Sequence, residues 1–194
     1  MKEVFLNDLS LSDITFGEDI LENLDFSYKS LNDIVFNNIK LYNLTFSDSN
    51  FKKLIFNHCE LINCVFVNCN FNDIKIENSK CLNINISDSK LSKLEIKDSL
   101  ISNVDFKNNK YDLSKIDISK LQSMKYLDCI IKNIDYNYSE LSDLSFYNSK
   151  VNNSKFYTSK MSNIDINFRD FEGSEFSVSQ ILDIVINQGI DIKE

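Results

Sequence analysis

The chain has 194 residues and a mass of 22.5 kDa, which suits a single domain or one elongated array. It contains no proline, tryptophan or alanine and only three glycines, so it lacks most of the residues that usually mark turns and loops. A single histidine excludes a site with several histidine ligands, and a net charge of −8 argues against direct binding to nucleic acid phosphates.

A period of five residues runs along the chain from Leu6 to Phe176. All 35 positions of this register are apolar or aromatic. Helices repeat near 3.6 residues and strands repeat at 2, so neither element alone produces such a pattern. We therefore expect these positions to form the centre of a core. Its clearest part is a ladder of phenylalanines, Phe16, Phe26, Phe36, Phe46, Phe56 and Phe66.

Two further columns accompany this register. Two residues before each centre, large residues such as Ile34 and Leu44 alternate with small ones such as Ser49 and Cys59, and both kinds face the same core. Two residues after each centre, 22 of 32 positions are Asn or Asp, which tolerate the positive φ that a tight corner needs. Like residues recur every 20 positions, so four sides of five residues complete one turn.

Segments 79–83 (SKCLN) and 149–153 (SKVNN) show the pattern in its plain form. In this pattern the chain resembles the pentapeptide-repeat proteins, although it has no Ala at the small position. The resemblance implies an all-β solenoid, a right-handed quadrilateral β-helix of about nine coils over residues 1–176. The handedness comes from the family and not from the spacing.

Three places strain the pattern before the tail. Asp19 and Lys29 both occupy inward positions, where they either splay outward or pair across the core. The segment 107–127 loses its polar corners, with Leu113, Ile118 and Ser123 where Asn or Asp is expected, so it forms either an irregular coil or an extruded loop. Phe168 and Arg169 break a corner and an inward position near the end.

The tail 177–194 is expected to be a helix followed by a short extended end. Ser177 or Ser179 caps its start and Gly189 ends it. A solenoid must cover its open end, so the helix is expected to be a cap. The tail also resembles that of the quinolone-resistance branch of the family, which implies a homodimer. The apolar residues assigned to that contact are Ile181, Leu182, Val185, Ile186 and Ile190.

Cysteines are the residues that most suggest hidden chemistry, because Cys59, Cys64 and Cys69 follow His58 at intervals of five. Consecutive fives fall on different sides of a prism, where Cys serves as a small core residue. We expect no metal and no cofactor. With no glycine-rich phosphate loop, we also expect no enzyme. Five cysteines, no signal peptide and no apolar run of membrane length indicate the cytoplasm.

Charge is unevenly distributed along the chain. Residues 1–50 carry a net charge of −6 and residues 163–194 carry −5, whereas residues 107–160 carry +3. The quinolone-resistance branch implies a bacterial DNA mimic that binds DNA gyrase or topoisomerase IV and confers fluoroquinolone resistance. The alternative is a structural scaffold or interaction module with a different partner. The acidic surface assigned to a partner comprises Asp165, Asp170, Glu172 and Glu175.

Overall fold

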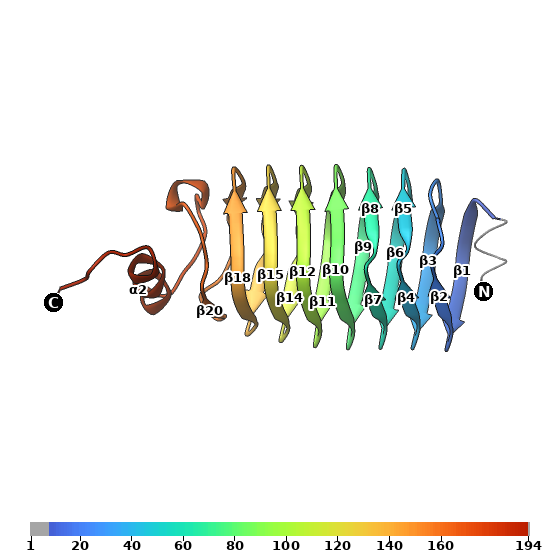
Figure 1. Ribbon diagram of the computed structural model, residues 1–194, viewed down its shortest axis with the longest axis horizontal. Helices are drawn as coiled ribbons and strands as arrows, with labels where there is room; N and C mark the ends of the chain where they lie inside the picture. The colour runs from blue at the N-terminus through green and yellow to red at the C-terminus, as the bar shows by residue number, and fades with distance from the viewer. Residues whose placement is uncertain (1–7, 194) are drawn as a thin grey trace.

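The protein is a straight rod of stacked coils. The computed structural model describes residues 8–193, so Leu6, the first position of the register, and Glu194 lie outside the described residues. Figure 1 shows the strands stacked along one axis, from β1 at one end to the helix α2 beyond the last strands at the other. The fold is a parallel β-solenoid with a C-terminal helix.

Two ten-stranded sheets form the walls of the rod. The first sheet contains β1 (Ser10–Gly17), β3 (Ser30–Asn37), β6 (Asn50–Asn57), β9 (Asn70–Glu77), β11 (Lys90–Lys97), β13 (Lys110–Asp112), β14 (Lys115–Asp117), β16 (Ile130–Lys132), β17 (Asp135–Asn137) and β19 (Lys150–Asn152). The second contains β2 (Ile20–Glu22), β4 (Lys40–Tyr42), β5 (Thr45–Ser47), β7 (Glu60–Ile62), β8 (Val65–Val67), β10 (Lys80–Ser87), β12 (Leu100–Lys107), β15 (Lys120–Leu127), β18 (Glu140–Tyr147) and β20 (Lys160–Ser162).

Paired strands are parallel and lie 20 residues apart in the sequence, as in the series Leu11, Leu31 and Phe51. This register confirms the 20-residue turn. The main path of each sheet contains eight strands, so the rod has about eight turns and not the nine that we expected. The ninth level forms no named strand in residues 8–193 and pairs through an isolated bridge between Lys155 and Glu175 and a hydrogen bond from the Asn153 N–H to the Glu172 carbonyl at 3.0 Å. The chain then leaves the ladder for α2.

The corners adopt the predicted conformation. Every fifth residue from Asp13 to Asn153 has a positive φ. One row of corners forms an amide ladder, in which the Nδ2 of Asn43, Asn63, Asn83 and Asn103 each donates to the Oδ1 of the asparagine one coil earlier, at 3.0, 2.9, 2.9 and 2.6 Å. The asparagines therefore tie neighbouring coils together and also permit the turn.

The core consists of the predicted centres. All six phenylalanines of the expected ladder are buried. The rings of Phe36 and Phe56 stack with centroids 5.0 Å apart, and Phe46 and Phe66 stack at the same distance. Inward serines and cysteines complete the wall through backbone contacts. The Oγ of Ser79, for example, accepts from the Cys59 N–H at 2.9 Å.

The segment 107–127 does not form a loop. Its corner residues Leu113, Ile118 and Ser123 have φ of 54°, 45° and 54°, like the asparagine corners. The strand β15 within it pairs in full register with β12 and β18. The buried centres and the backbone ladder hold this coil in place despite its unusual corners.

Asp19 and Lys29 do not pair. Asp19 is exposed, and its Oδ1 accepts from the Ile20 N–H at 2.7 Å. Lys29 is buried, and its Nζ donates to the Asp8 carbonyl oxygen at 2.8 Å. Only Asp19 therefore splays outward. The lysine satisfies its ammonium group with a backbone carbonyl at the N-terminal end of the rod.

After the last coils, the 3-10 helix η1 (Phe168–Asp170) leads to α2 (Val178–Asn187). Ser177 is the N-cap, and it forms a reciprocal capping box with Gln180. Gly189 has a φ of 81°, which ends the helical conformation as the sequence predicted.

Candidate interaction surfaces

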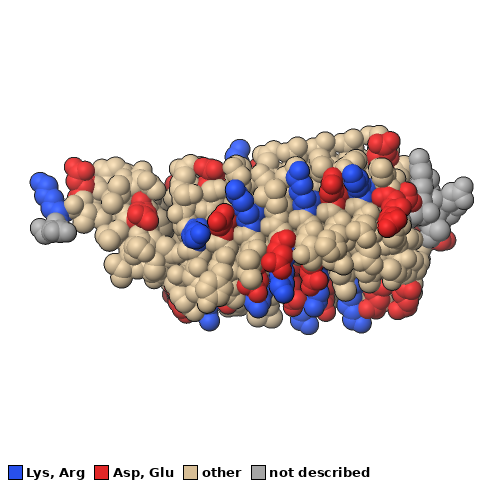
Figure 2. All heavy atoms as spheres, turned by 90° about the horizontal axis from the view of Figure 1, so that it is seen from below, with Lys and Arg blue, Asp and Glu red and all other residues tan. Residues whose placement is uncertain are grey.

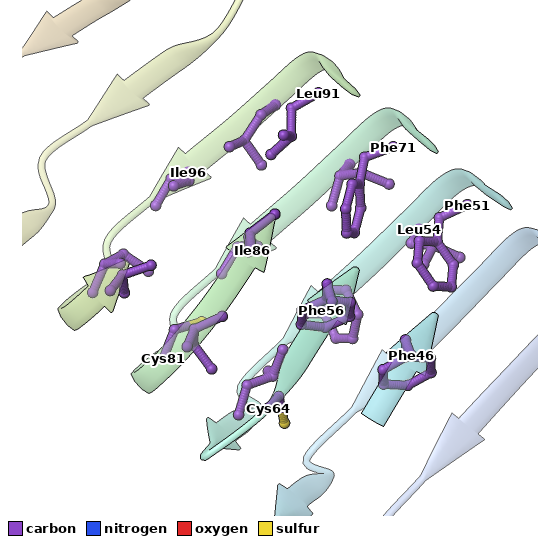
Figure 3. Close-up of a pocket in the computed structure, with 18 of the residues that line it drawn as sticks. Phe46, Phe51, Leu54, Phe56, Cys64, Phe71, Cys81, Ile86, Leu91 and Ile96 are labelled. Atoms are coloured by element: carbon purple, nitrogen blue, oxygen red, sulfur yellow. The ribbon is translucent and has the colours of Figure 1, made fainter. Parts of the chain in front are cut away.

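The interior of the rod is apolar among the residues that the structure describes. An apolar cavity of about 110 Å³ follows the axis and is lined by core side chains. Figure 3 shows Phe51, Phe56 and Phe71 among the side chains that line it.

The cysteines are core residues. All five are free and buried. Burial raises the pKa of Cys64 and Cys69 to about 11 and that of Cys81 to about 12. Within residues 8–193, no group of three or more His, Cys, Asp or Glu side chains is placed to hold a metal ion. His58 is one of the positive-φ corners and is exposed.

Outward side chains form charged columns in which lysines alternate with acids from coil to coil. On one side, Lys40 lies 3.8 Å from Glu60, and further along Lys160 lies 3.7 Å from Glu140. The Tyr42 hydroxyl also donates to Glu60 at 2.6 Å, and this hydrogen bond raises its pKa to about 12. Figure 2 shows basic side chains (blue) and acidic side chains (red) interspersed along the middle of the rod. The pairing largely neutralises the middle surface.

The four acids predicted as a partner surface do not form one patch. Asp165 and Glu175 bridge to different ladders, and their separation of ten residues places them on opposite sides of the prism. Asp170 is partly buried and forms an ion pair with Lys150. Asp165, Glu172 and Glu175 are exposed. These acids are spread around the C-terminal coil.

The more concentrated acidic surface lies at the other end. Residues 8–33 contain seven acids and a single lysine, Lys29, whose ammonium is buried. Figure 2 shows acidic side chains, in red, at the end of the rod that lies opposite the C-terminal helix. The charge count of the N-terminal segment indicated it, although the individual residues were not singled out. The exposed acids, here called the N-terminal acidic end, are Asp8, Asp13, Glu18, Asp19, Glu22 and Asp25.

The inner face of α2 covers the open end of the last coils. The Gln180 Nε2 donates to the carbonyl oxygens of Phe156 and Ser159 at 2.8 and 2.7 Å. The Gln188 Nε2 donates to the Ile166 carbonyl at 2.8 Å. The Phe156 carbonyl also accepts from the Ser159 N–H at 2.8 Å, so the two glutamines add to the backbone hydrogen bonds at the end of the ladder. Helix α2 is therefore a cap.

The outer face of α2 is apolar. Among the residues predicted for dimerisation, Leu182, Ile186 and Ile190 are exposed by 40%, 54% and 54%, whereas Ile181 and Val185 are partly buried. Val178 was not predicted, yet it is 78% exposed and precedes Leu182 by four residues on the same face. An apolar stripe thus faces away from the rod. None of the helices in residues 8–193 has the length and apolar character to cross a bilayer.

Comparison with known proteins gives one family match and several distant structures. Residues 29–112 match the family model described as a pentapeptide repeat region. No curated protein matches the chain. Among solved structures, QnrB1, a plasmid-mediated fluoroquinolone resistance protein, is 13% identical with a TM-score of 0.40, covering 91% of this chain and 100% of that one.

HetL, which is involved in heterocyst differentiation regulation in Nostoc sp. strain PCC 7120, is 11% identical with a TM-score of 0.43. The match covers 87% of this chain and 89% of that one. These values are too low to carry an argument about partner or activity. The matched repeat region, the five-residue register and the 20-residue ladder agree, and together they establish that the chain is a pentapeptide-repeat protein.

Proposed function

We propose that the protein is a non-catalytic DNA mimic that binds a type II topoisomerase, DNA gyrase or topoisomerase IV, and thereby confers fluoroquinolone resistance. The observation that carries the proposal is a rod whose net negative charge is concentrated towards its two ends, while lysines offset the acids between them. A basic groove that holds duplex DNA would accept such a rod by electrostatic complementarity. The free, buried thiols and the reducing conditions that they favour are consistent with a cytoplasmic protein.

The dimensions suit the proposal if two rods join. Eight levels at ~4.8 Å give a length of roughly 38 Å. Two rods joined through α2 would span about twice that length, or about 22 base pairs at ~3.4 Å per pair. Joining at α2 would bring the exposed Glu172 and Glu175 of both copies to the middle, with the N-terminal acidic ends outermost.

The apolar outer face of α2 supports the homodimer. Replacing Leu182 and Ile186 with Glu should yield a monomer in analytical ultracentrifugation at micromolar concentration. Ser179→Glu, which adds charge to the first turn of the same helix beside that face, is the matched control and should leave the dimer intact. A monomeric unmodified protein would reject the dimer without bearing on topoisomerase binding.

The binding proposal is tested by supercoiling assays with purified gyrase, with and without a fluoroquinolone. We expect inhibition or protection that weakens as salt rises and that added DNA reverses. Glu172→Gln with Glu175→Gln should weaken the effect several-fold. The matched control, Asp98→Asn with Asp105→Asn, neutralises two exposed acids in the middle of the rod and should change little. No effect of the unmodified protein at micromolar concentration would reject the proposal.

A second candidate, a scaffold or interaction module with a different partner, is favoured by the alternating lysines and acids of the middle surface. Duplex DNA presents uninterrupted negative charge, whereas this surface pairs Lys75 with Glu95 at 3.2 Å and Lys53 with Asp33 at 3.0 Å. If gyrase binding is absent, or if it proves insensitive to salt, the scaffold becomes the better description.

A further inference from the structure

The core of the rod loses its aromatic rings over one short stretch. Five of the six centre positions from Phe46 to Phe71 are phenylalanine. The next six centre positions contain no aromatic residue. They are Ile76, Cys81, Ile86, Leu91, Ile96 and Ile101, here called the ring-free core. Aromatic rings return at Phe106 and Tyr111, whose centroids lie 5.3 Å apart.

The backbone wall keeps its register around the ring-free core. The strands β9 and β11 pair in full 20-residue register, and so do β10 and β12, as in the phenylalanine coils. The inward positions two residues before these centres add no volume. The small ones are serines, and the large ones, Ile74, Ile84 and Leu94, match Leu44 and Leu54 of the earlier coils. The same prism therefore encloses smaller side chains here.

The smallest side chain of the ring-free core is that of Cys81. Its partners in the ladder are Leu61 one coil before it and Ile101 one coil after it, so the thiol stands in a column of branched aliphatic residues. The other four cysteines lie two residues before a centre and donate to backbone carbonyls, as the Cys59 Sγ does to the Phe36 carbonyl at 3.3 Å. Cys81 alone among the cysteines thus replaces a centre.

The axial cavity of about 110 Å³ passes through this stretch, because all six residues of the ring-free core line it. Figure 3 shows Cys81, Ile86 and Ile96 among these side chains. Apolar cavities stay dry, and one of about 150 Å³ lined by similar residues binds benzene or xenon. An apolar molecule would restore the dispersion contacts that the lining lacks, whereas a polar one would lose its hydrogen bonds to water.

We propose that the ring-free core is a binding site for one small, uncharged, apolar molecule, centred beside Cys81. The class of ligand extends from a monatomic gas to a short hydrocarbon. The site lies between the two walls of the rod, so a ligand enters when a coil opens locally. It uses no outward side chain, so it is independent of any partner bound at the outer surface.

Crystals of the unmodified protein pressurised with xenon test the site directly. Xenon is the probe because it is apolar and forms no hydrogen bond. We expect an anomalous peak on the axis within about 4.5 Å of the side chains of Cys81 and at least one of Ile86 and Ile96. No peak, or a peak only in another part of the cavity, would overturn the proposal.

Filling the space with a side chain provides an independent test. Cys81→Leu restores the kind of residue that the neighbouring coils carry. It should abolish the xenon peak and raise the melting temperature by roughly 2–4 °C. Cys59→Leu is the matched control at a buried cysteine outside the cavity lining, and it should lower the melting temperature because leucine overpacks that position. A melting temperature of Cys81→Leu that is unchanged or lower, or a xenon peak that persists in it, would reject the site.

Discussion

Two stretches of the rod turn the same corners with different residues. Between Asn23 and Asn103, one row of corners is an unbroken amide ladder. Between residues 113 and 138, corners carry Leu113, Ile118 and Tyr138, which are more than half exposed and still have φ between 45° and 55°. The path of the chain is the same in both. The buried centres and the backbone ladder therefore set the shape, and the corner residue sets only how favourable each turn is.

The strongest test asks whether the core, and not the corners, determines the fold. It replaces one buried core residue and leaves every corner residue unchanged. Phe56→Asp places an unpaired charge between the rings of Phe36 and its neighbours, in a core with no partner for it. We expect loss of the folded state, seen as loss of the β signal in circular dichroism. Phe56→Leu should retain the fold at a cost of about 1–2 kcal/mol. A folded Asp variant would contradict the dominance of the core.

The buried acidic groups of both stretches predict sensitivity to alkali. Burial raises the pKa of Cys64 to about 11 and of Cys81 to about 12, above the ordinary value of 9.0, so the thiols ionise first in the unfolded chain. Tyr136, raised to about 12 from 10.0, behaves in the same way. The unfolded state then binds fewer protons, and stability falls as pH rises from about 9 towards 12. Each group contributes up to about 1.4 kcal/mol per pH unit.

Melting temperatures measured between pH 7 and 11 check this expectation. They should be level up to about pH 9 and then fall steadily. Cys81→Ser is not a suitable control because it buries another polar group, so Cys81→Val is preferred and should make the fall shallower. A constant melting temperature up to pH 11 would contradict the burial of these thiols.

At the C-terminal cap, the side chains of two helix residues, Gln180 and Gln188, donate to backbone carbonyls of the last coils. Gln180→Ala removes the side-chain donor to the Ser159 carbonyl and one of three donors to the Phe156 carbonyl, which keeps the Ser159 N–H and hydroxyl, and should cost about 2 kcal/mol. Gln188→Ala strands only the Ile166 carbonyl and should cost about half as much. If both variants lose the same small free energy of unfolding in urea, water replaces the glutamine side chains as donors to these carbonyls.

The amide ladder can be broken at one rung. Asn63 donates to Asn43 and accepts from Asn83, both at 2.9 Å, and it has a φ of 56°. Asn63→Ile loses both bonds and places a β-branched residue in the left-handed region, for an expected cost of about 2 kcal/mol. Asn63→Gly keeps the conformation and loses only the bonds, so the difference between the two variants isolates the backbone strain.

Much of this architecture is predictable from the repeat. The five-residue register identified the core phenylalanines and the corners, and the capping signals identified α2. The 20-residue register also places Lys150 one coil before Asp170. The ion pair between them, which makes Asp170 less accessible to a partner, could therefore have been predicted from the sequence. Lys29 was not predictable, because its position depends on the Asp8 carbonyl at the irregular start of the rod. The sequence left segment 107–127 open between an irregular coil and a loop, because its corner residues disfavour a positive φ. That local preference contributes less free energy than the packing of the core and the pairing of the strands, which keep the segment in the coil.

The smallest expected effect is a gain in stability in the second stretch. Ile118 is 57% exposed and has a φ of 45°, which is unfavourable for a β-branched residue. Ile118→Asn removes that strain and exposes no core surface, so urea unfolding should show a stabilisation of about 1 kcal/mol. Ile131→Asn, at a buried centre, is the contrasting control and should destabilise strongly. If Ile118→Asn instead weakens the protein, then Ile118 packs in a way that its exposure does not reveal, and the corner would be part of the framework of this coil.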